Sequence, residues 1–234
     1  MSESIQYELS GDVAILRIDD GKANALDPTI IAALHTGLDR AGKEAGAVLL
    51  TGRPGRFSAG FNLGVLLDGG LDAARGLVTA GAELALHIGR HSAPVVIACN
   101  GHAIAMGAVL LLAADLRIGA SGDFKIGFNE VAIGMTPPVF LVEFARERLS
   151  KRHLQRATVQ AEMYSPESAV DAGFLDRVLA PDDLFAGSLE EAQRLAQLPR
   201  SAFASTRGRL REATLERIEA TLADNMARAF PTGS

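Results

Sequence analysis

The stretch that decides the fold runs from Asn100 to Pro138 and reads NGHAIAMGAVLLLAADLRIGASGDFKIGFNEVAIGMTPP. It opens on an Asn100-Gly101 turn directly after the apolar, strand-like run Val95–Ala98. The small apolar residues of Ala103–Ala114 predict a buried helix, and Leu116–Ile118 predicts a short strand. This alternation of strands and helices indicates an α/β fold with a largely parallel sheet.

The same stretch also carries the candidate chemistry. The N-terminus of a helix built from small residues exposes unpaired backbone N–H groups, which favour negative charge. Glu130 stands as a single carboxylate in apolar surroundings, and Pro137-Pro138 opens the next predicted helix. An acid in such surroundings is a candidate base with a shifted pKa. Together, an oxyanion site and a lone base indicate chemistry at the carbon next to a carbonyl group.

The chain before this stretch follows the same α/β pattern. A hairpin is expected from two alternating runs, Ser4–Leu9 and Val13–Ile18. Asp27 is the expected N-cap of a helix with Pro28 at its first position. Further expected elements are a buried strand over Ala47–Thr51, a loop over Gly52–Gly60, a helix towards Leu67 capped by Asn62, and a helix over Ala73–Arg90.

The chain after this stretch is mainly helical. Helices are expected over Val139–Leu149, over Ser150–Gln160, from Ser165, from Pro181 and over Ser205–Phe230, with one strand over Leu175–Leu179. We expect a core over residues 1–180 and a helical extension of the same domain over residues 181–234, because no linker-like segment separates them.

Composition narrows the class of protein. The chain has 234 residues, of which 48% are hydrophobic and 22% charged, and its net charge of −5 argues against nucleic acid as a partner. The longest apolar run, Ala103–Ala114, is shorter than the ~20 residues that a membrane span needs. Ser2–Ser10 lacks the apolar region of a signal peptide. We therefore expect a cytoplasmic protein without a membrane partner.

Several other site classes are disfavoured. The single cysteine, Cys99, rules out an intramolecular disulfide and is expected to serve packing. No P-loop or dinucleotide fingerprint occurs. His87 and His91 are spaced as helical neighbours without an H-E-x-x-H motif, so no metal site is expected.

Six segments, in order and spacing, resemble the crotonase (enoyl-CoA hydratase/isomerase) family. They are Lys22–Leu26, Arg56–Leu63, Asn100–Ala103 with Gly107, Asp115–Ile118, Ile126–Glu130 with Gly134, and Ala169, Gly173, Leu175 and Asp176. The match extends from about Ile5 to Leu179. It implies a spiral of ββα turns with a helical C-terminal trimerisation region, a homotrimer or hexamer, and acyl-CoA thioesters as substrates. No cofactor is implied, since coenzyme A arrives as part of the substrate.

The resemblance also implies which residues form the site. The backbone N–H groups of Phe61 and Met106 would hold the thioester oxygen, and Glu130 would be the catalytic residue. The residues implied to bind substrate or CoA are Lys22, Ala23, Ala25, Ala59, Gly60, Asn62, Leu63 and Asn129. Because Phe61 and Met106 are larger than the usual family residues, we expect their side chains to narrow the acyl pocket.

The informative departure from the family is at Val109. Hydratases of the family carry two glutamates, and Val109 stands where the first is expected, so Glu130 alone remains. Hydration needs one group to activate water and another to deliver a proton. Moving a double bond from C3 to C2 needs only one base that removes a C2 proton and returns it at C4. The sequence around Glu130 and Pro137–Phe140 is similar to the mitochondrial-type Δ3,Δ2-enoyl-CoA isomerases, so an isomerase is expected.

Other interpretations stay open at this point. A hydratase, or another enolate enzyme such as a decarboxylase or thioesterase, would need a second group, for which Glu83 is the first candidate. A catalytically weak acyl-CoA binder would keep the oxyanion site alone. His102 is expected to be packed or facing solvent. The basic residues Lys151, Arg152, Arg207, Arg209 and Arg211 are expected to lie on solvated helix faces, with CoA phosphates as the alternative partner.

Overall fold

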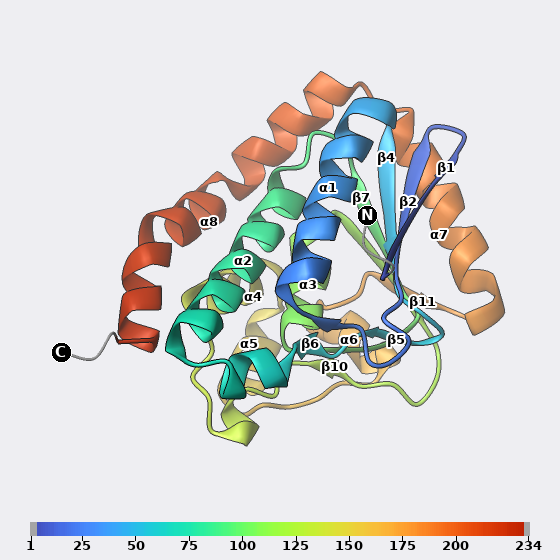
Figure 1. Cartoon of the computed structure of the whole chain (residues 1–234). Helices are drawn as coiled ribbons and strands as arrows, with labels where there is room; N and C mark the ends of the chain where they lie inside the picture. The colour runs from blue at the N-terminus through green and yellow to red at the C-terminus, as the bar shows by residue number, and fades with distance from the viewer. Residues whose placement is uncertain (1–3, 232–234) are drawn as a thin grey trace.

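A six-stranded sheet forms the centre of the molecule. The computed structural model describes residues 4–231. The strands run in the order β1, β2, β4, β7, β9, β11, and all neighbours are parallel except β1 and β2 (Figure 1). Their bounds are β1 Ile5–Ser10, β2 Val13–Ile18, β4 Ala47–Thr51, β7 Val95–Cys99, β9 Leu116–Ala120 and β11 Arg177–Leu179. The predicted N-terminal hairpin and the largely parallel sheet are confirmed.

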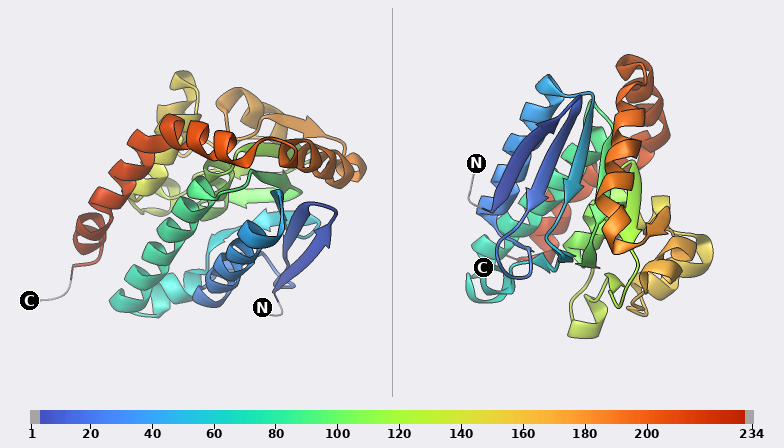
Figure 2. Two further views of the ribbon diagram at one scale, coloured as in Figure 1. Left: turned by 90° about the horizontal axis from the view of Figure 1, so that it is seen from above. Right: turned by 90° about the vertical axis from the view of Figure 1, so that its right-hand side faces the viewer.

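Helices cover both faces of this sheet, as its sequence requires. Every residue of β4 and β7 is buried, so neither face of these strands can meet solvent. On one face lie α1 (Pro28–Glu44), α2 (Leu71–Arg90) and α3 (Met106–Ala113). The other face packs against α7 (Pro181–Ala196) (Figure 2). The main core therefore lies between the sheet and the first three helices, next to the site described below.

Short strands from successive turns of the chain form two small sheets. The first contains β10 (Ile126–Gly127), β8 (Gly101–Ile104) and β5 (Gly55–Ser58), and the second pairs β3 (Ala25–Leu26) with β6 (Gly60–Phe61). The chain thus repeats a unit of a central strand, a short outer strand and a helix, as in β7, β8 and α3. This arrangement is the predicted spiral of ββα turns.

Two predictions in this region are wrong in detail. The expected loop Gly52–Gly60 contains β5, and the first residues of the expected helix Ala103–Ala114 belong to β8. In both places the chain pairs with a strand from another turn of the spiral, which local periodicity does not reveal. The consequence for the site is that α3 begins at Met106 and not three residues earlier.

The helix caps follow the sequence more closely. Asp27 caps α1, because its Oδ1 accepts a hydrogen bond from Ile30 N at 2.8 Å. Asn62 Oδ1 accepts from Gly64 N at 3.0 Å, at the start of the single π-helical turn η1 (Gly64–Asp68). The polar residue therefore fixes where each chain segment enters its helix.

The C-terminal part is helical, as expected. It comprises η2 (Val131–Ile133), α4 (Val139–Arg148), α5 (Lys151–Thr158), α6 (Pro166–Ala172), α7 and α8 (Arg200–Ala229). The long helix α8 packs along α2 and α4, and its last turn reaches the same end of the molecule as the start of α2 (Figure 1). Within residues 4–231, no helix is long and apolar enough to cross a membrane.

The basic residues of α8 correct one expectation. Arg207 and Arg211 lie neither on a solvated face nor free for CoA phosphates, because both are buried in ion pairs. Arg207 Nη1 lies 2.8 Å from Asp115 Oδ2, and Arg211 Nε lies 3.0 Å from Glu147 Oε1. Arg209, Lys151 and Arg152 are exposed, as expected. Charge patterns alone did not show that α8 uses two arginines to attach to the core.

Candidate active site

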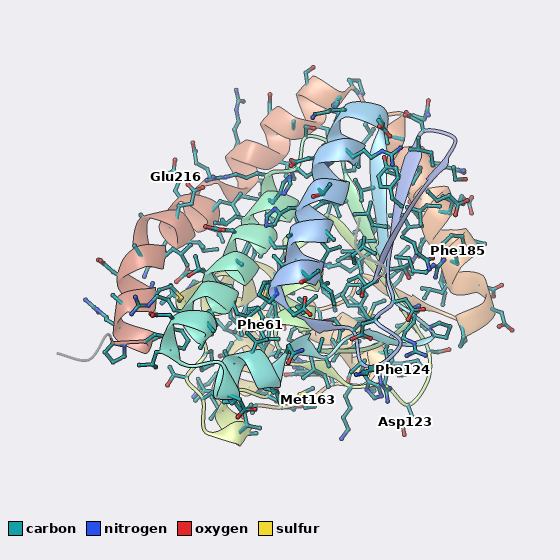
Figure 3. All side chains as sticks on the ribbon, viewed as in Figure 1. Phe61, Asp123, Phe124, Met163, Phe185 and Glu216 are labelled. Carbon is teal, nitrogen blue, oxygen red and sulfur yellow. The ribbon has the colours of Figure 1, made fainter. Side chains whose placement is uncertain are left out.

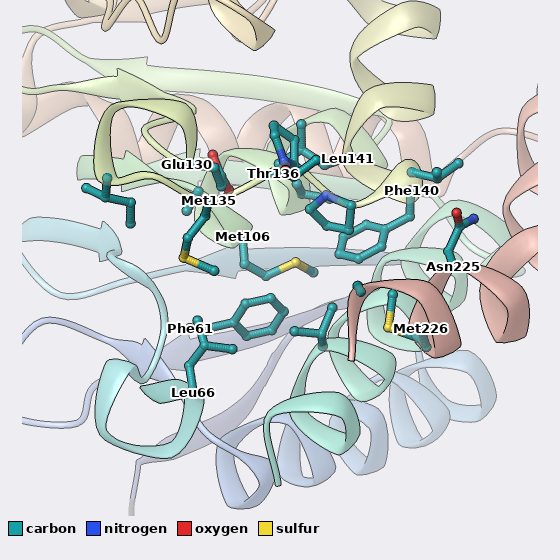
Figure 4. Close-up of a pocket in the computed structure, with 18 of the residues that line it drawn as sticks. Phe61, Leu66, Met106, Glu130, Met135, Thr136, Phe140, Leu141, Asn225 and Met226 are labelled. Atoms are coloured by element: carbon teal, nitrogen blue, oxygen red, sulfur yellow. The ribbon is translucent and has the colours of Figure 1, made fainter. Parts of the chain in front are cut away.

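Glu130 follows β10 and is held by a tight backbone turn. Its carbonyl oxygen accepts hydrogen bonds from Ile133 N at 3.1 Å and Met135 N at 2.8 Å. Phe128, two residues earlier, is buried in the main core and anchors the segment. The Glu130 side chain points into a cavity, above Met106 in the close-up view (Figure 4). The turn therefore presents one carboxylate to an enclosed space.

The surroundings of Glu130 favour its neutral form. The residue is 8% exposed, and Oε2 has no hydrogen-bond partner within the described residues. Burial raises the pKa of the carboxyl group to about 7, against a smaller opposing effect of hydrogen bonds from the N–H groups of Glu130 and Asn129. A carboxyl group with this pKa can accept a proton and return it at neutral pH.

The N-terminus of α3 lies in the same cavity. Ala105 adopts φ 52° and ψ −120°, a backbone conformation that residues with a side chain rarely adopt, and α3 begins at the next residue. Ala105 N donates to Gly127 O at 2.9 Å, which ties this corner to the strand before Glu130. The first N–H groups of a helix have no partner within the helix, so the Met106 N–H is available to a ligand.

The second expected N–H donor belongs to a segment in contact with this corner. Gly60 has φ 89°, and a Cβ atom there would lie 2.9 Å from Ile104 O and 3.2 Å from Met106 N. No side chain fits in that space, so the backbone of β6 approaches that of Ala105-Met106 directly. The structure thus brings Phe61 and Met106, the two expected oxyanion donors, into adjacent segments.

The cavity is about 650 Å³ in volume and largely apolar. Val109 lies in its wall, and Glu130 is its single acidic residue within the described chain. Apolar lining residues include Phe61, Leu66, Val78, Met106, Met135, Phe140 and Leu141. The cavity accordingly suits an apolar chain attached to a group that reacts beside Glu130.

Sequence reasoning missed one wall of the cavity. The last turn of α8 contributes lining residues, including Asn225, Met226 and Phe230. Arg75 of α2 donates a hydrogen bond to the Phe230 carbonyl, and Met226 is buried. The signal in the sequence is the apolar pair Met226 and Phe230 at helical spacing, but nothing there indicates that α8 folds back across α2.

The other expected CoA-binding residues are divided between the cavity and its surroundings. Ala59, Leu63 and Asn129 line the cavity. Lys22, Ala23, Ala25, Gly60 and Asn62 are not among its lining residues; they lie on or beside the paired strands β3 and β6. Ala59 N donates to Ala23 O at 3.1 Å, so these two segments are directly connected.

The remaining candidates lie outside the cavity. His102 Nδ1 accepts a hydrogen bond from Lys125 N at 2.9 Å, and its ring packs edge-on against Phe124. Phe124 lies well apart from Phe61 in Figure 3. Glu83 is exposed on α2. Cys99 is buried in β7, where burial raises the pKa of its thiol to about 12. None of the three supplies a second acid or a nucleophile to the cavity.

Two solved structures have a similar fold, and a further relative is similar in sequence. The apo structure of an enoyl-CoA isomerase from Mycobacterium tuberculosis is 38% identical, with a TM-score of 0.93 over 98% of this chain and 100% of that one. Human mitochondrial Δ3-Δ2-enoyl-CoA isomerase is 25% identical, with a TM-score of 0.93 over 97% and 91% of the two chains. A probable enoyl-CoA hydratase from Rhodobacter capsulatus is 30% identical over 206 residues, which are 87% of this chain and 79% of that protein.

The fold and the site therefore define a crotonase-type enzyme for acyl-CoA thioesters. The family model described as enoyl-CoA hydratase/isomerase matches residues 8–230. The chain belongs to the enoyl-CoA hydratase/isomerase family, which confirms the resemblance found in its sequence.

Proposed function

We propose that this protein is an enoyl-CoA isomerase that moves a double bond from C3 to C2 of an enoyl-CoA. The observation that carries the proposal is the single acid of the cavity: Glu130 lines it, Val109 lies in its wall, and the Glu130 pKa is about 7. The names of similar proteins do not choose between the reactions, because one solved Mycobacterium tuberculosis structure is described as an enoyl-CoA isomerase and another as a probable enoyl-CoA hydratase.

Proton transfer at two carbons follows from this geometry. The thioester oxygen accepts hydrogen bonds from Phe61 N–H and Met106 N–H, which stabilise the negative charge that develops on that oxygen. Glu130 takes a proton from C2, the C1–C2 double bond forms and the carbonyl π electrons move onto the thioester oxygen, which gives a dienolate that keeps its C3–C4 double bond. The protonated Glu130 then donates the same proton to C4, while the carbonyl bond re-forms, C2–C3 becomes the double bond and C3–C4 becomes a single bond. Atoms and electrons balance without a cofactor, because coenzyme A is part of the substrate.

Hydration is the alternative, and several relatives and solved structures carry the name of an enoyl-CoA hydratase. Water must be held and deprotonated while C2 receives a proton, a task for two acid–base groups. Val109 is an alkyl side chain and cannot supply the second group. The isomerase reaction therefore requires nothing that the cavity lacks, whereas hydration does.

The deciding experiment separates the two reactions by product. Purified protein is incubated with 3-hexenoyl-CoA and, separately, with 2-hexenoyl-CoA, and products are identified by chromatography and mass. We expect the 3-enoyl thioester to become the 2-enoyl isomer without a gain in mass. Rapid addition of water to 2-hexenoyl-CoA would contradict the proposal. Absence of both reactions, with acyl-CoA still bound, would indicate a binding role or another acyl-CoA substrate.

A further inference from the structure

Gly81, in the middle of α2, lies directly behind the ring of Phe61. A Cβ atom at Gly81 would lie 2.3 Å from Phe61 Cζ, 2.4 Å from Phe61 Cε1 and 3.5 Å from Met106 Sδ. Glycine destabilises a helix interior relative to alanine, and no positive φ requires it at this position. The space taken by the ring is therefore the physical reason for glycine here.

The ring lies along the length of the cavity. Phe61 and Met106 face each other in the close-up view, between Glu130 at one end and Met226 of α8 at the other (Figure 4). Both side chains lie against α2 at Gly81 and together line the cavity, so an acyl chain that places its thioester beside Glu130 and extends towards α8 runs along them. Gly81 itself is buried and does not line the cavity.

We infer that Gly81 determines which acyl chains this protein accepts, by setting how far the Phe61 ring withdraws from the cavity. With glycine at this position, the ring rests against α2 and leaves room for a linear chain that reaches the last turn of α8. Any larger residue would push the ring away from α2 into the cavity and narrow the space for the acyl chain, because protein interiors have little free volume to absorb a methyl group. The inference rests on acyl-CoA binding and not on the direction of the proposed isomerisation.

The matched control lies on the same helix. Gly76 of α2 has no atom within 4 Å of a Cβ built on it. Gly76→Ala therefore makes the same chemical change in the same helix with no effect on the cavity. Any general consequence of adding a methyl group to α2 should appear equally in both variants.

The test uses equilibrium binding of saturated acyl-CoAs, which do not react. Dissociation constants for butyryl-, octanoyl- and dodecanoyl-CoA are measured by calorimetry with the full-length protein. For Gly81→Ala we expect about tenfold weaker binding of dodecanoyl-CoA and less than about a twofold change for butyryl-CoA, as overpacking at a single methyl group implies. Gly76→Ala should match the unaltered protein for all three. A second change, Phe61→Leu, should restore dodecanoyl-CoA binding in the Gly81→Ala background.

Several results would overturn the inference. Equal weakening for all three thioesters would mean that the added methyl group displaces the backbone of β6, and so the N–H of Phe61, rather than narrowing the acyl passage. Unchanged binding would mean that the ring does not limit the passage. If Gly81→Ala does not fold, Phe61→Leu alone still decides the matter, since it must strengthen dodecanoyl-CoA binding relative to butyryl-CoA. Failure of the isomerase assay would leave these binding results fully interpretable.

Discussion

The two ends of α3 differ in whether the polar groups there have hydrogen-bond partners. At its N-terminus, the N–H of Met106 faces a cavity whose carboxylate, Glu130, also lacks a hydrogen-bond partner for Oε2 within residues 4–231. At its C-terminus, the carbonyl groups of Leu112, Ala113 and Ala114 accept hydrogen bonds from Arg148 and Arg211. One short, fully buried helix thus has polar groups without partners at its N-terminal end and hydrogen-bonded carbonyl groups at its C-terminal end.

The difference shows which end serves stability and which serves a ligand. Buried polar groups are normally paired, because an unpaired one loses its bonds to water without replacement. The arginines meet this requirement, and Glu147 pairs in turn with Arg211. Glu130 remains without such a partner, and its pKa rises to about 7. Among the described residues, four buried side chains have a polar atom without a partner, and Glu130 is the acidic one and the one that lines the cavity.

The largest expected effect is on the rate of turnover, when Glu130 beside the N-terminal end of α3 is replaced. Glu130→Gln keeps the shape of the side chain but removes the base, so we expect the isomerisation rate to fall by about 10²–10⁴-fold, the usual contribution of a general base. The measurement is kcat on 3-hexenoyl-CoA. Glu83→Gln, an exposed position on α2, is the matched control and should retain full activity. An unchanged rate in Glu130→Gln would show that another group takes the proton.

A comparable effect, on the free energy of unfolding, is expected from a change at the C-terminal end of α3. Arg211 is 1% exposed, and Arg211→Met would leave the Glu147 carboxylate and the Ala113 carbonyl without their donor. Breaking a buried ion pair in this way costs about 3–5 kcal/mol of unfolding free energy. Urea unfolding monitored by circular dichroism measures the loss. Arg209→Met, on an exposed position of α8, should change stability by less than about 0.5 kcal/mol; an equal shift in both variants would refute the structural role of Arg211.

These two ends differ in how far the sequence predicted them. The lone glutamate, the small-residue helix and Val109, which replaces the second glutamate, all lie within one stretch. Their spacing and chemistry could therefore be interpreted from the sequence alone. At the C-terminal end of α3, Arg211 of α8 pairs with Glu147 of α4, two residues that lie far apart in the sequence. No local pattern distinguishes an arginine that pairs inside the core from one on a solvated face. The expectation that Arg207 and Arg211 lie on a solvated face is wrong for this reason.

The same limit explains the errors in the fold. The large strands and helices were predicted because their apolar periodicity is local. The short strands β5 and β8 exist because they pair with one another across turns of the spiral. Likewise, the contribution of Met226 and Phe230 to the cavity depends on where the far end of α8 lies. Long-range contacts decide such features, and a single sequence does not show them.

The third prediction is a pH dependence that reports directly on the unpaired carboxyl group. Because Glu130 must be ionised to accept the C2 proton, kcat/KM should be constant well above pH 7 and fall about tenfold per pH unit well below it. At pH 5 the rate should thus be about 100-fold below its plateau. The profile is measured on 3-hexenoyl-CoA between pH 5 and 9, with circular dichroism at each pH to confirm that the protein stays folded. A rate that holds constant down to about pH 5 would contradict the raised pKa.

The smallest expected effect is a gain in stability when the unpaired carboxylate is removed. The pKa of Glu130 is about 7 in the folded protein and 4.5 without the fold, so the unfolded chain loses its proton first as pH rises. Stability therefore declines between these two values and stays lower above pH 7. Glu130→Gln, which carries no charge, should therefore have a free energy of unfolding about 3 kcal/mol larger than that of the unaltered protein at pH 8, and nearly the same at pH 4. Urea unfolding at both pH values measures this, and Glu83→Gln should show no such difference. A variant less stable at pH 8 would mean that the ionised carboxylate has favourable partners, and the contrast between the two ends of α3 would no longer hold.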